Sequence, residues 1–215
     1  MPPPPNGSPT PGRRERTRAA LLRSAGELFL ARGYAATTVN AIAAGAGVSL
    51  QTLYLVWGSK RALFEAARDA AASAAELPLP ADDWHDRVVG SLTHGRGAEP
   101  DAAAYLVAFS AELVRVAGRV APYWHLERDA AATDPEMAIA WSHAQERRRT
   151  TMSHVAAALP QHGRRPGLDD AEVSDTLWAL AGPETYELLT RVGGYSPAAY
   201  ETWLGRTLTG ALCTS

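Results

Sequence analysis

Apolar residues recur along this chain at the spacing of an α-helix, and no alternating strand pattern competes with it. From Arg13 onward the sequence is rich in Ala, Leu, Arg and Glu, which favour helices. In the first segment, which Gly33 ends, the apolar residues at i, i+4, i+7 and i+8 are Leu21, Ala25, Leu28 and Phe29. With 215 residues, 46% of them hydrophobic, the chain can bury a sizeable core. The pattern therefore predicts an all-α protein.

Capping residues divide the next part of the chain into short helices. Thr37 or Thr38 caps a second helix, and a Gly-Ala-Gly stretch ends it because glycine accepts the backbone of a tight turn. Ser49 caps a third helix over residues 50–56, and a fourth begins after Ser59.

The remaining sequence predicts a series of longer helices. They are expected at residues 82–93, 101–118, 121–131, 135–159, 169–192 and 197–213. Gly118 separates the second of these from the third. Pro183 lies inside the fifth and should kink it near residues 179–182, because proline removes a backbone hydrogen bond.

The net charge of −2 hides an uneven distribution. Residues 1–75 hold nine Arg or Lys against four acids, a balance of +5, and the remainder carries −7. This asymmetry favours an N-terminal region that meets a polyanion, although an ordinary solvated surface can have the same balance.

Composition also bears on the compartment. Cys213 is the one cysteine, which excludes an internal disulfide framework or a cysteine-rich zinc site and favours a reducing, cytoplasmic setting. The N-terminus lacks the apolar region of a secretory signal, and no apolar run reaches the ~18 residues of a membrane span. Residues 1–12 hold six of the 15 prolines and are expected to form a disordered tail.

Residues 37–64 place two short helices around a turn that contains glycine, which is the helix-turn-helix arrangement. Their sequence, TTVNAIAAGAGVSLQTLYLVWGSKRALF, resembles the DNA-binding signature of the TetR (tetracycline repressor) family of bacterial transcription regulators. The matching positions are Thr38, Val39, Ile42, Ala43, Ala46, Gly47, Val48, Ser49, Thr52, Leu53, Tyr54, Trp57 (where Phe is usual), Ser59, Lys60 and Leu63. The resemblance implies a DNA-binding domain over residues 13–75 and a larger helical domain over 76–215 that binds an effector and dimerises.

The third helix is expected to enter the major groove of DNA, ~12 Å wide, with its first residues against base edges. The small core that holds it is expected from Ile42, Val48, Leu53, Trp57 and Leu63. The predicted DNA-binding residues are Thr38, Ser49, Leu50, Gln51, Thr52, Tyr54, Leu55 and Lys60. Gln51 offers a donor and an acceptor suited to adenine. Leu50, Leu55 or the Thr52 methyl group can contact a thymine methyl group.

Other residues of this region suit the phosphate backbone. Tyr54, Thr38 and Lys60 can bind phosphate oxygens, which positions a protein without reading sequence. The family often places backbone contacts or a minor-groove arm at the start of the first helix. The arginines expected either there or in a solvated tail are Arg13, Arg14, Arg16 and Arg18. Leu55 and Val56 stand where the family commonly has polar or aromatic residues.

The later helices hold most of the aromatic residues, which form a plain core or line a ligand cavity. The family places its effector pocket among these helices. The candidates that the resemblance implies are Tyr105, Phe109, Tyr123, Trp124 and Trp141. His125 or His143 could supply a polar contact, or be an ordinary core or surface histidine.

The last two predicted helices resemble the dimerisation pair of the family. The expected interface residues are Leu177, Trp178, Tyr200, Trp203, Leu204 and Leu208. Two such pairs would pack as a four-helix bundle across a two-fold axis. The alternative is that these helices close onto their own domain.

No motif for catalysis is visible in the sequence. It contains no GxSxG, Walker A or HExxH pattern, and its six histidines lack paired metal-ligand spacing, so we expect no enzyme, cofactor or metal. We predict a transcriptional repressor that binds a palindromic operator as a homodimer and is released by a small-molecule effector, without a membrane partner. The alternatives are an activator or ligand-independent regulator on the same fold and, more distantly, a helical small-molecule-binding protein without DNA activity.

Overall fold

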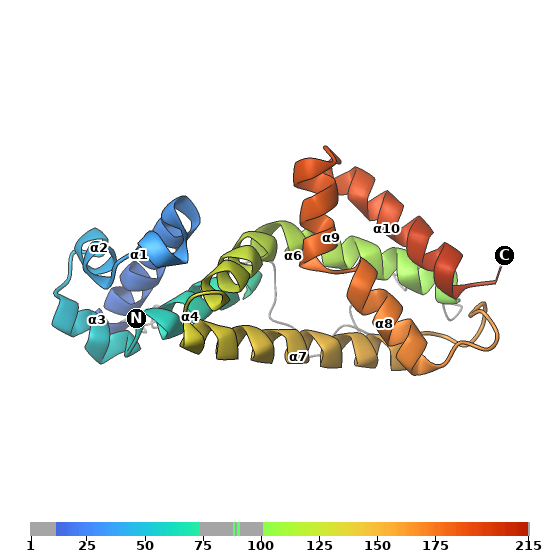
Figure 1. Cartoon of the computed structure of the whole chain (residues 1–215), viewed down its shortest axis with the longest axis horizontal. Helices are drawn as coiled ribbons and strands as arrows, with labels where there is room; N and C mark the ends of the chain where they lie inside the picture. The colour runs from blue at the N-terminus through green and yellow to red at the C-terminus, as the bar shows by residue number, and fades with distance from the viewer. Residues whose placement is uncertain (1–11, 74–87, 89, 91–100, 215) are drawn as a thin grey trace, which may run out of the picture. The chain divides into compact units, whose positions relative to one another are not determined.

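The computed structural model describes residues 12–73, 88, 90 and 101–214 (Figure 1). Over these residues the chain is helical with no strand, apart from an isolated bridge between Arg164 and buried Cys213, which confirms the predicted fold class. It divides into two compact units, Met1–Arg68 and Asp69–Ser215. The tail predicted at 1–12, the helix predicted at 82–93 and the boundary predicted at residue 75 lie wholly or mostly outside the described residues.

The N-terminal unit contains the predicted series of helices. They are α1 (Arg13–Ala36), α2 (Val39–Gly45), α3 (Leu50–Trp57) and the first part of α4 (Lys60–Ser73). The chain leaves helical geometry at Gly33, which has φ 82° and ψ 167°, as its predicted role as a helix stop requires. Among the described helices, none alone is long and apolar enough to cross a membrane, and α2 and α3 pass that test only together, as a pair bent by 100°.

Side-chain caps fix where these short helices begin. The hydroxyls of Thr38, Ser49 and Ser59 each accept a hydrogen bond from the backbone N–H three residues on, at 3.0–3.1 Å. Thr37 is not the cap, because its buried hydroxyl lies within 3.0 Å of two carbonyl oxygens of α1. Gly47 provides the turn between α2 and α3 with a φ of 66°.

An aromatic cluster joins α1 to α4. Phe29 stacks on Tyr34 with ring centroids 5.7 Å apart, and Phe64 meets both rings edge-on at 5.2 and 5.3 Å. All three side chains are buried. Of the core residues predicted from the sequence, those that are fully buried are Ile42, Leu53 and Leu63, and those that are half-buried are Val48 and Trp57.

Long and short helices build the C-terminal unit. They are α6 (Ala102–Ala131), α7 (Pro135–Ala158), α8 (Asp170–Leu180), α9 (Pro183–Glu187), the π-helical turn η1 (Leu188–Val192) and α10 (Pro197–Leu212). Helix α10 packs along α6, and α7 packs against both α6 and α8 (Figure 1). The fully buried side chains at the centre of this core include Tyr105, Leu106, Phe109, Val173, Leu177, Tyr200, Leu204 and Leu208.

The break predicted between residues 118 and 121 is wrong, because α6 runs through it as one helix. Gly118 is helical there, and it leaves room for Tyr186: a β-carbon at this position would lie 3.1 Å from the tyrosine hydroxyl. Pro122 also lies within the helix and removes one N–H. Residues of α6 before and after this point, such as Phe109 and Trp124, are buried. The free energy gained by that burial outweighs the helix-breaking preferences of Gly118 and Pro122.

The single kinked helix predicted over residues 169–192 is also wrong. Helix α8 stops at Leu180, and the chain becomes extended at Gly182 before Pro183 opens α9 as its first residue. Proline disfavours helical geometry in the residue before it, and it fits the first position of a helix, where no N–H is needed. The local effect of Pro183 is therefore a full break.

Gly45 and Ser24 form a tight contact between α2 and α1 that mutagenesis can test. A β-carbon at Gly45 would lie 2.4 Å from Ser24 Oγ, which donates a buried 3.0 Å hydrogen bond to the Ile42 carbonyl. Gly45→Ala should therefore lower the free energy of unfolding by about 1–3 kcal/mol. In a Ser24→Ala background the same change should cost less or stabilise, because alanine favours a helix over glycine by about 1 kcal/mol.

Urea denaturation of the wild type, both single variants and the double variant measures this coupling. Equal effects of Gly45→Ala in the two backgrounds would contradict the contact.

Candidate functional site

Helix α3 buries one side and exposes the other. Leu53 is fully buried, while Leu55 is 82% exposed, Tyr54 47% and Leu50 36%. Gln51 is also exposed, and Thr52 is half-buried with its hydroxyl 2.8 Å from that of Ser49. Exposed apolar side chains on so short a helix form a surface suited to another molecule.

A hollow of about 760 Å³ lies beside this exposed side of α3. Its lining residues are Arg13, Arg14 and Thr17 from α1, Gly47, Val48 and Ser49 from the turn, and Thr52, Leu55 and Val56 from α3. The fold therefore brings Arg13 and Arg14, which the sequence left as either an arm or a tail, next to the α3 surface. Both arginines are exposed and begin α1.

Two cation–π contacts flank α3. The Arg18 guanidinium lies 3.7 Å from the ring centroid of Trp57, and Lys60 Nζ lies 4.1 Å from that of Tyr34. Lys60, which was predicted to bind phosphate, is thus half-buried at the start of α4. Thr38 is exposed at the start of α2, so the predicted DNA-binding residues all lie on α2, α3, α4 or their caps.

The C-terminal unit contains an apolar cavity of about 220 Å³. It is lined from α6, from α7 and from the break between α8 and α9. Its lining residues are Leu113, Val116, Ala117, Val120, Ala121, Trp124, Arg148, Thr151, Met152, Ala181, Gly182, Pro183 and Tyr186. Of the described residues in this wall, the only one with a charged side chain is Arg148.

The predicted pocket residues have different positions relative to this cavity. Trp124 lines it, and Trp141 packs edge-on against Trp124 with centroids 4.7 Å apart. Tyr105 and Phe109 are fully buried in the core instead, where burial raises the pKa of Tyr105 to about 12. Tyr123 is buried as well, and burial raises its pKa.

Sequence reasoning missed Arg148 and Tyr186 as wall residues. Arg148 stands between Arg147 and Arg149 in a run that is typical of a solvated helix face, so its charge gave no signal. The rotation of α7 about its own axis turns Arg148 towards the core, so that its side chain is mostly buried while Arg147 and Arg149 stay exposed.

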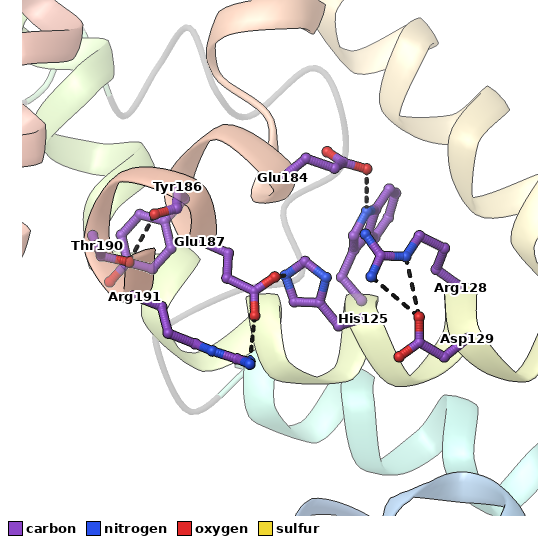
Figure 2. A network of polar contacts seen from close by, with 9 residues as sticks. His125, Arg128, Asp129, Glu184, Tyr186, Glu187, Thr190 and Arg191 are labelled. Atoms are coloured by element: carbon purple, nitrogen blue, oxygen red, sulfur yellow. Dashed lines mark hydrogen bonds and ion pairs between the residues drawn. The ribbon is translucent and has the colours of Figure 1, made fainter. Parts of the chain in front are cut away.

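Polar contacts join α6 to α9 next to this cavity (Figure 2). Trp124 Nε1 donates a 2.7 Å hydrogen bond to Glu184 Oε1. His125 Nε2 lies 2.5 Å from Glu187 Oε2, and the other oxygen of Glu187 accepts from Arg191 at 2.7 Å. His125 is therefore a buried histidine with an acidic neighbour, whereas His143 is exposed.

The residues predicted for a dimer interface belong largely to the core of their own chain. Leu177, Tyr200, Leu204 and Leu208 are fully buried within the C-terminal unit, and Trp178 and Trp203 are half-buried. In this arrangement a second chain would meet other side chains of α8 and α10. A shallow groove where α10 meets Val107 of α6 is lined by Val107, Glu201, Thr202, Gly205, Arg206, Thr209 and Gly210.

Comparison with known proteins assigns the N-terminal unit to a family. Residues 21–67 match the family model of bacterial regulatory proteins of the tetR family. A comparison with functionally curated proteins gave no significant match.

Solved structures resemble the chain over nearly its whole length. NalD of Pseudomonas aeruginosa, the secondary repressor of the MexAB-OprM multidrug efflux pump, is 18% identical with a TM-score of 0.64, covering 94% of this chain and 99% of NalD. A protein from Saccharomonospora viridis in complex with choline is 21% identical with a TM-score of 0.66, covering 94% and 100%. A proposed TetR-family regulator from Mesorhizobium loti MAFF303099 is 20% identical with a TM-score of 0.65, covering 95% and 100%. These likenesses establish the shared fold.

The position of His125 makes stability depend on pH. Burial lowers the pKa of His125 below its ordinary 6.5, although Glu187 opposes this shift. Below about pH 6.5 the unfolded chain therefore binds a proton at this histidine more readily than the folded chain, and the free energy of unfolding should fall as the pH drops. His125→Asn should reduce that fall, measured by urea denaturation at several pH values between about 7.5 and 5.5.

His143→Asn is the matched control, because His143 is exposed on α7. If both variants keep the pH dependence of the wild type, burial of His125 does not contribute to it.

Proposed function

Since this chain belongs to the TetR family of bacterial regulatory proteins, we propose that it is a repressor that binds a palindromic DNA operator as a homodimer and leaves it when a small molecule binds. It is a transcription regulator with a helix-turn-helix domain. A protein that acts on chromosomal DNA works in the cytoplasm of a bacterium, and we propose that compartment for it.

The observation that carries this proposal is the exposed side of α3. Gln51 and Leu55 project from a helix whose opposite side is anchored by fully buried Leu53. The hollow beside them adds the guanidinium groups of Arg13 and Arg14. Polar, apolar and cationic groups together match a DNA groove, where bases are read between two rows of phosphates.

Each side chain suits a particular part of the duplex. Gln51 can pair with the N6 and N7 atoms of adenine, and Leu50, Leu55 or the Thr52 methyl group can pack on a thymine methyl group. Ser49 caps α3 and orients its first turn.

Phosphate contacts suit the residues that border α3. Tyr54 and Thr38 offer exposed hydroxyl groups, and Lys60 offers an ammonium group at the start of α4. Arg13 and Arg14 extend this positive edge from α1.

The dimer would use the exposed sides of α8 and α10, packed as a four-helix bundle with the same helices of a second copy. A two-fold axis through such a bundle relates two copies of α3. Helix-turn-helix dimers read half-sites about one turn of DNA apart, ~34 to 36 Å, so the operator should be an imperfect palindrome.

The cavity beside Trp124 is the proposed effector site. The similar protein from Saccharomonospora viridis was solved with choline, which supports a small molecule as the signal. NalD is a repressor, which supports repression as the action. Binding would favour a state in which α4 shifts and the two α3 helices change their separation. A coupling free energy of ~1 to 3 kcal/mol would weaken operator binding about 5- to 150-fold.

Selection of binding sites from a random duplex library tests the proposed function. Full-length protein should enrich an imperfect palindrome whose half-sites are about one helical turn apart. Affinity for that duplex should fall steeply with salt, because phosphate contacts release counterions. Failure to enrich any sequence would contradict operator binding, and enrichment of isolated half-sites would contradict the dimer. Reporter expression in a deletion strain then separates a repressor from an activator.

Two variants separate base reading from backbone contact. Lys60→Ala should weaken binding to all duplexes alike and reduce the salt dependence, because it removes a phosphate contact. Gln51→Ala should relax preference at one position of each half-site, at a cost of about 1–3 kcal/mol on the preferred sequence. Fluorescence anisotropy with the selected duplex and single-base variants measures both, and identical profiles would contradict this division of roles.

A further inference from the structure

The cavity beside Trp124 combines small size, an apolar wall and a single charge. Its volume of about 220 Å³ is below the ~300–1,000 Å³ that is usual for pockets of drug-sized ligands. Aliphatic and aromatic side chains form most of the wall, and Trp124 and Tyr186 offer ring surfaces. Among the wall residues that the structure describes, Arg148 carries the only formal charge, and that charge is positive.

Arg148 uses part of its hydrogen-bonding capacity within the protein. Its Nη2 donates to the Trp178 carbonyl in the last turn of α8, and its Nη1 lies 3.9 Å from Glu184 Oε2, beyond hydrogen-bond distance. Over the described part of the chain, Nη1 and Nε make no hydrogen bond. A guanidinium has five N–H donors in a planar fork, so donors remain for another acceptor.

The environment of Arg148 makes the binding of such an acceptor energetically favourable. Its side chain is 13% exposed, and burial lowers the pKa of its guanidinium from the ordinary value, which reflects the cost of a charge removed from water. Glu184 compensates only in part, because one of its oxygens accepts from Trp124 Nε1 and its side chain is 40% exposed. Glu184 is not a wall residue of the cavity, although its Oε2 would lie 2.9 Å from a β-carbon at Gly182, which is one. Because the Glu184 side chain is partly exposed, water screens part of its charge.

We propose that the ligand of this cavity is a small organic acid with an apolar body, whose acidic group pairs with Arg148. The body packs against the apolar wall between α6 and α7. The carboxylate accepts hydrogen bonds from the N–H groups of Arg148 that the Trp178 carbonyl does not use. An organic cation of the same shape meets the like charge of Arg148 instead. This inference rests on the proposed function, which places a small-molecule site in the cavity.

The test uses wild-type protein and ω-phenylalkanoic acids with two to six methylene groups, each with its primary amide and primary amine. These three compounds share one apolar body and differ in charge. Isothermal titration calorimetry near neutral pH should show that the best acid binds about tenfold more tightly than its amide, and that the amine binds most weakly. Equal affinities of acid and amide, tighter binding of the amine, or no binding by any acid would each overturn the proposal.

Substitutions then locate the acidic group. Arg148→Gln should remove the preference of acid over amide, and Arg148→Lys, which keeps the charge and loses the planar fork, should retain part of it. Arg147→Gln, next to it on the exposed side of α7, should keep the full preference. Thermal melting of each variant without ligand shows whether it is folded, and the wild-type series decides the matter if Arg148→Gln is not. Retention of the full preference by folded Arg148→Gln would overturn the assignment to Arg148.

Operator binding is measured separately with the selected duplex. An acid that binds in calorimetry and leaves operator affinity unchanged would contradict the proposed release mechanism while supporting the ligand class. Release of the duplex by the amine or amide, with no binding of the acid, would support the release mechanism and overturn the ligand class.

Discussion

The proposed DNA-binding surface depends on a helix that is too short to exist alone. An isolated helix of eight residues is unstable in water, because the cost of nucleation exceeds what so few hydrogen bonds return. Helix α3 exists because its N-terminus is capped by Ser49 and because Leu53 is fully buried in a core that includes Ile42 and Leu63. With one side held in this way, α3 can leave Leu55 exposed, at a cost that the rest of the unit offsets.

A second constraint governs the C-terminal unit: the chain must leave its helix before Pro183. The break leaves the carbonyl of Trp178 in a last helical turn, where the guanidinium of Arg148 binds it. Gly182 leaves room for this guanidinium because it has no side chain: a β-carbon at Gly182 would lie 2.8 Å from Arg148 Nη2. The residues of the break also line the cavity. A helix end, the partner of a covered arginine and part of the cavity wall thus lie together at one proline.

The sequence predicts the local features of this fold well and its side-chain environments less well. The caps at Thr38, Ser49 and Ser59 follow from hydroxyl groups before apolar stripes, and the structure confirms them. Gly118 failed as a predicted break because packing around it outweighs its local preference. Periodicity identified the apolar stripe of α10 but could not tell whether the chain's own core or a second copy covers it, and Leu204 lies in the chain's own core. Apart from Trp124, the cavity wall was missed for a similar reason, since its residues come from separate helices whose rotations the sequence does not specify.

The single cysteine of the chain has a practical consequence. Cys213 is buried at the end of α10, and burial raises the pKa of its thiol, so the reactive thiolate is scarce and covered. Maleimide reagents should therefore spare it, and the native cysteine need not be replaced before labelling. A spin label on a cysteine introduced at Arg32 or Asn40, both exposed in the N-terminal unit, would allow the proposed dimer to be tested by pulsed electron resonance in an otherwise natural chain.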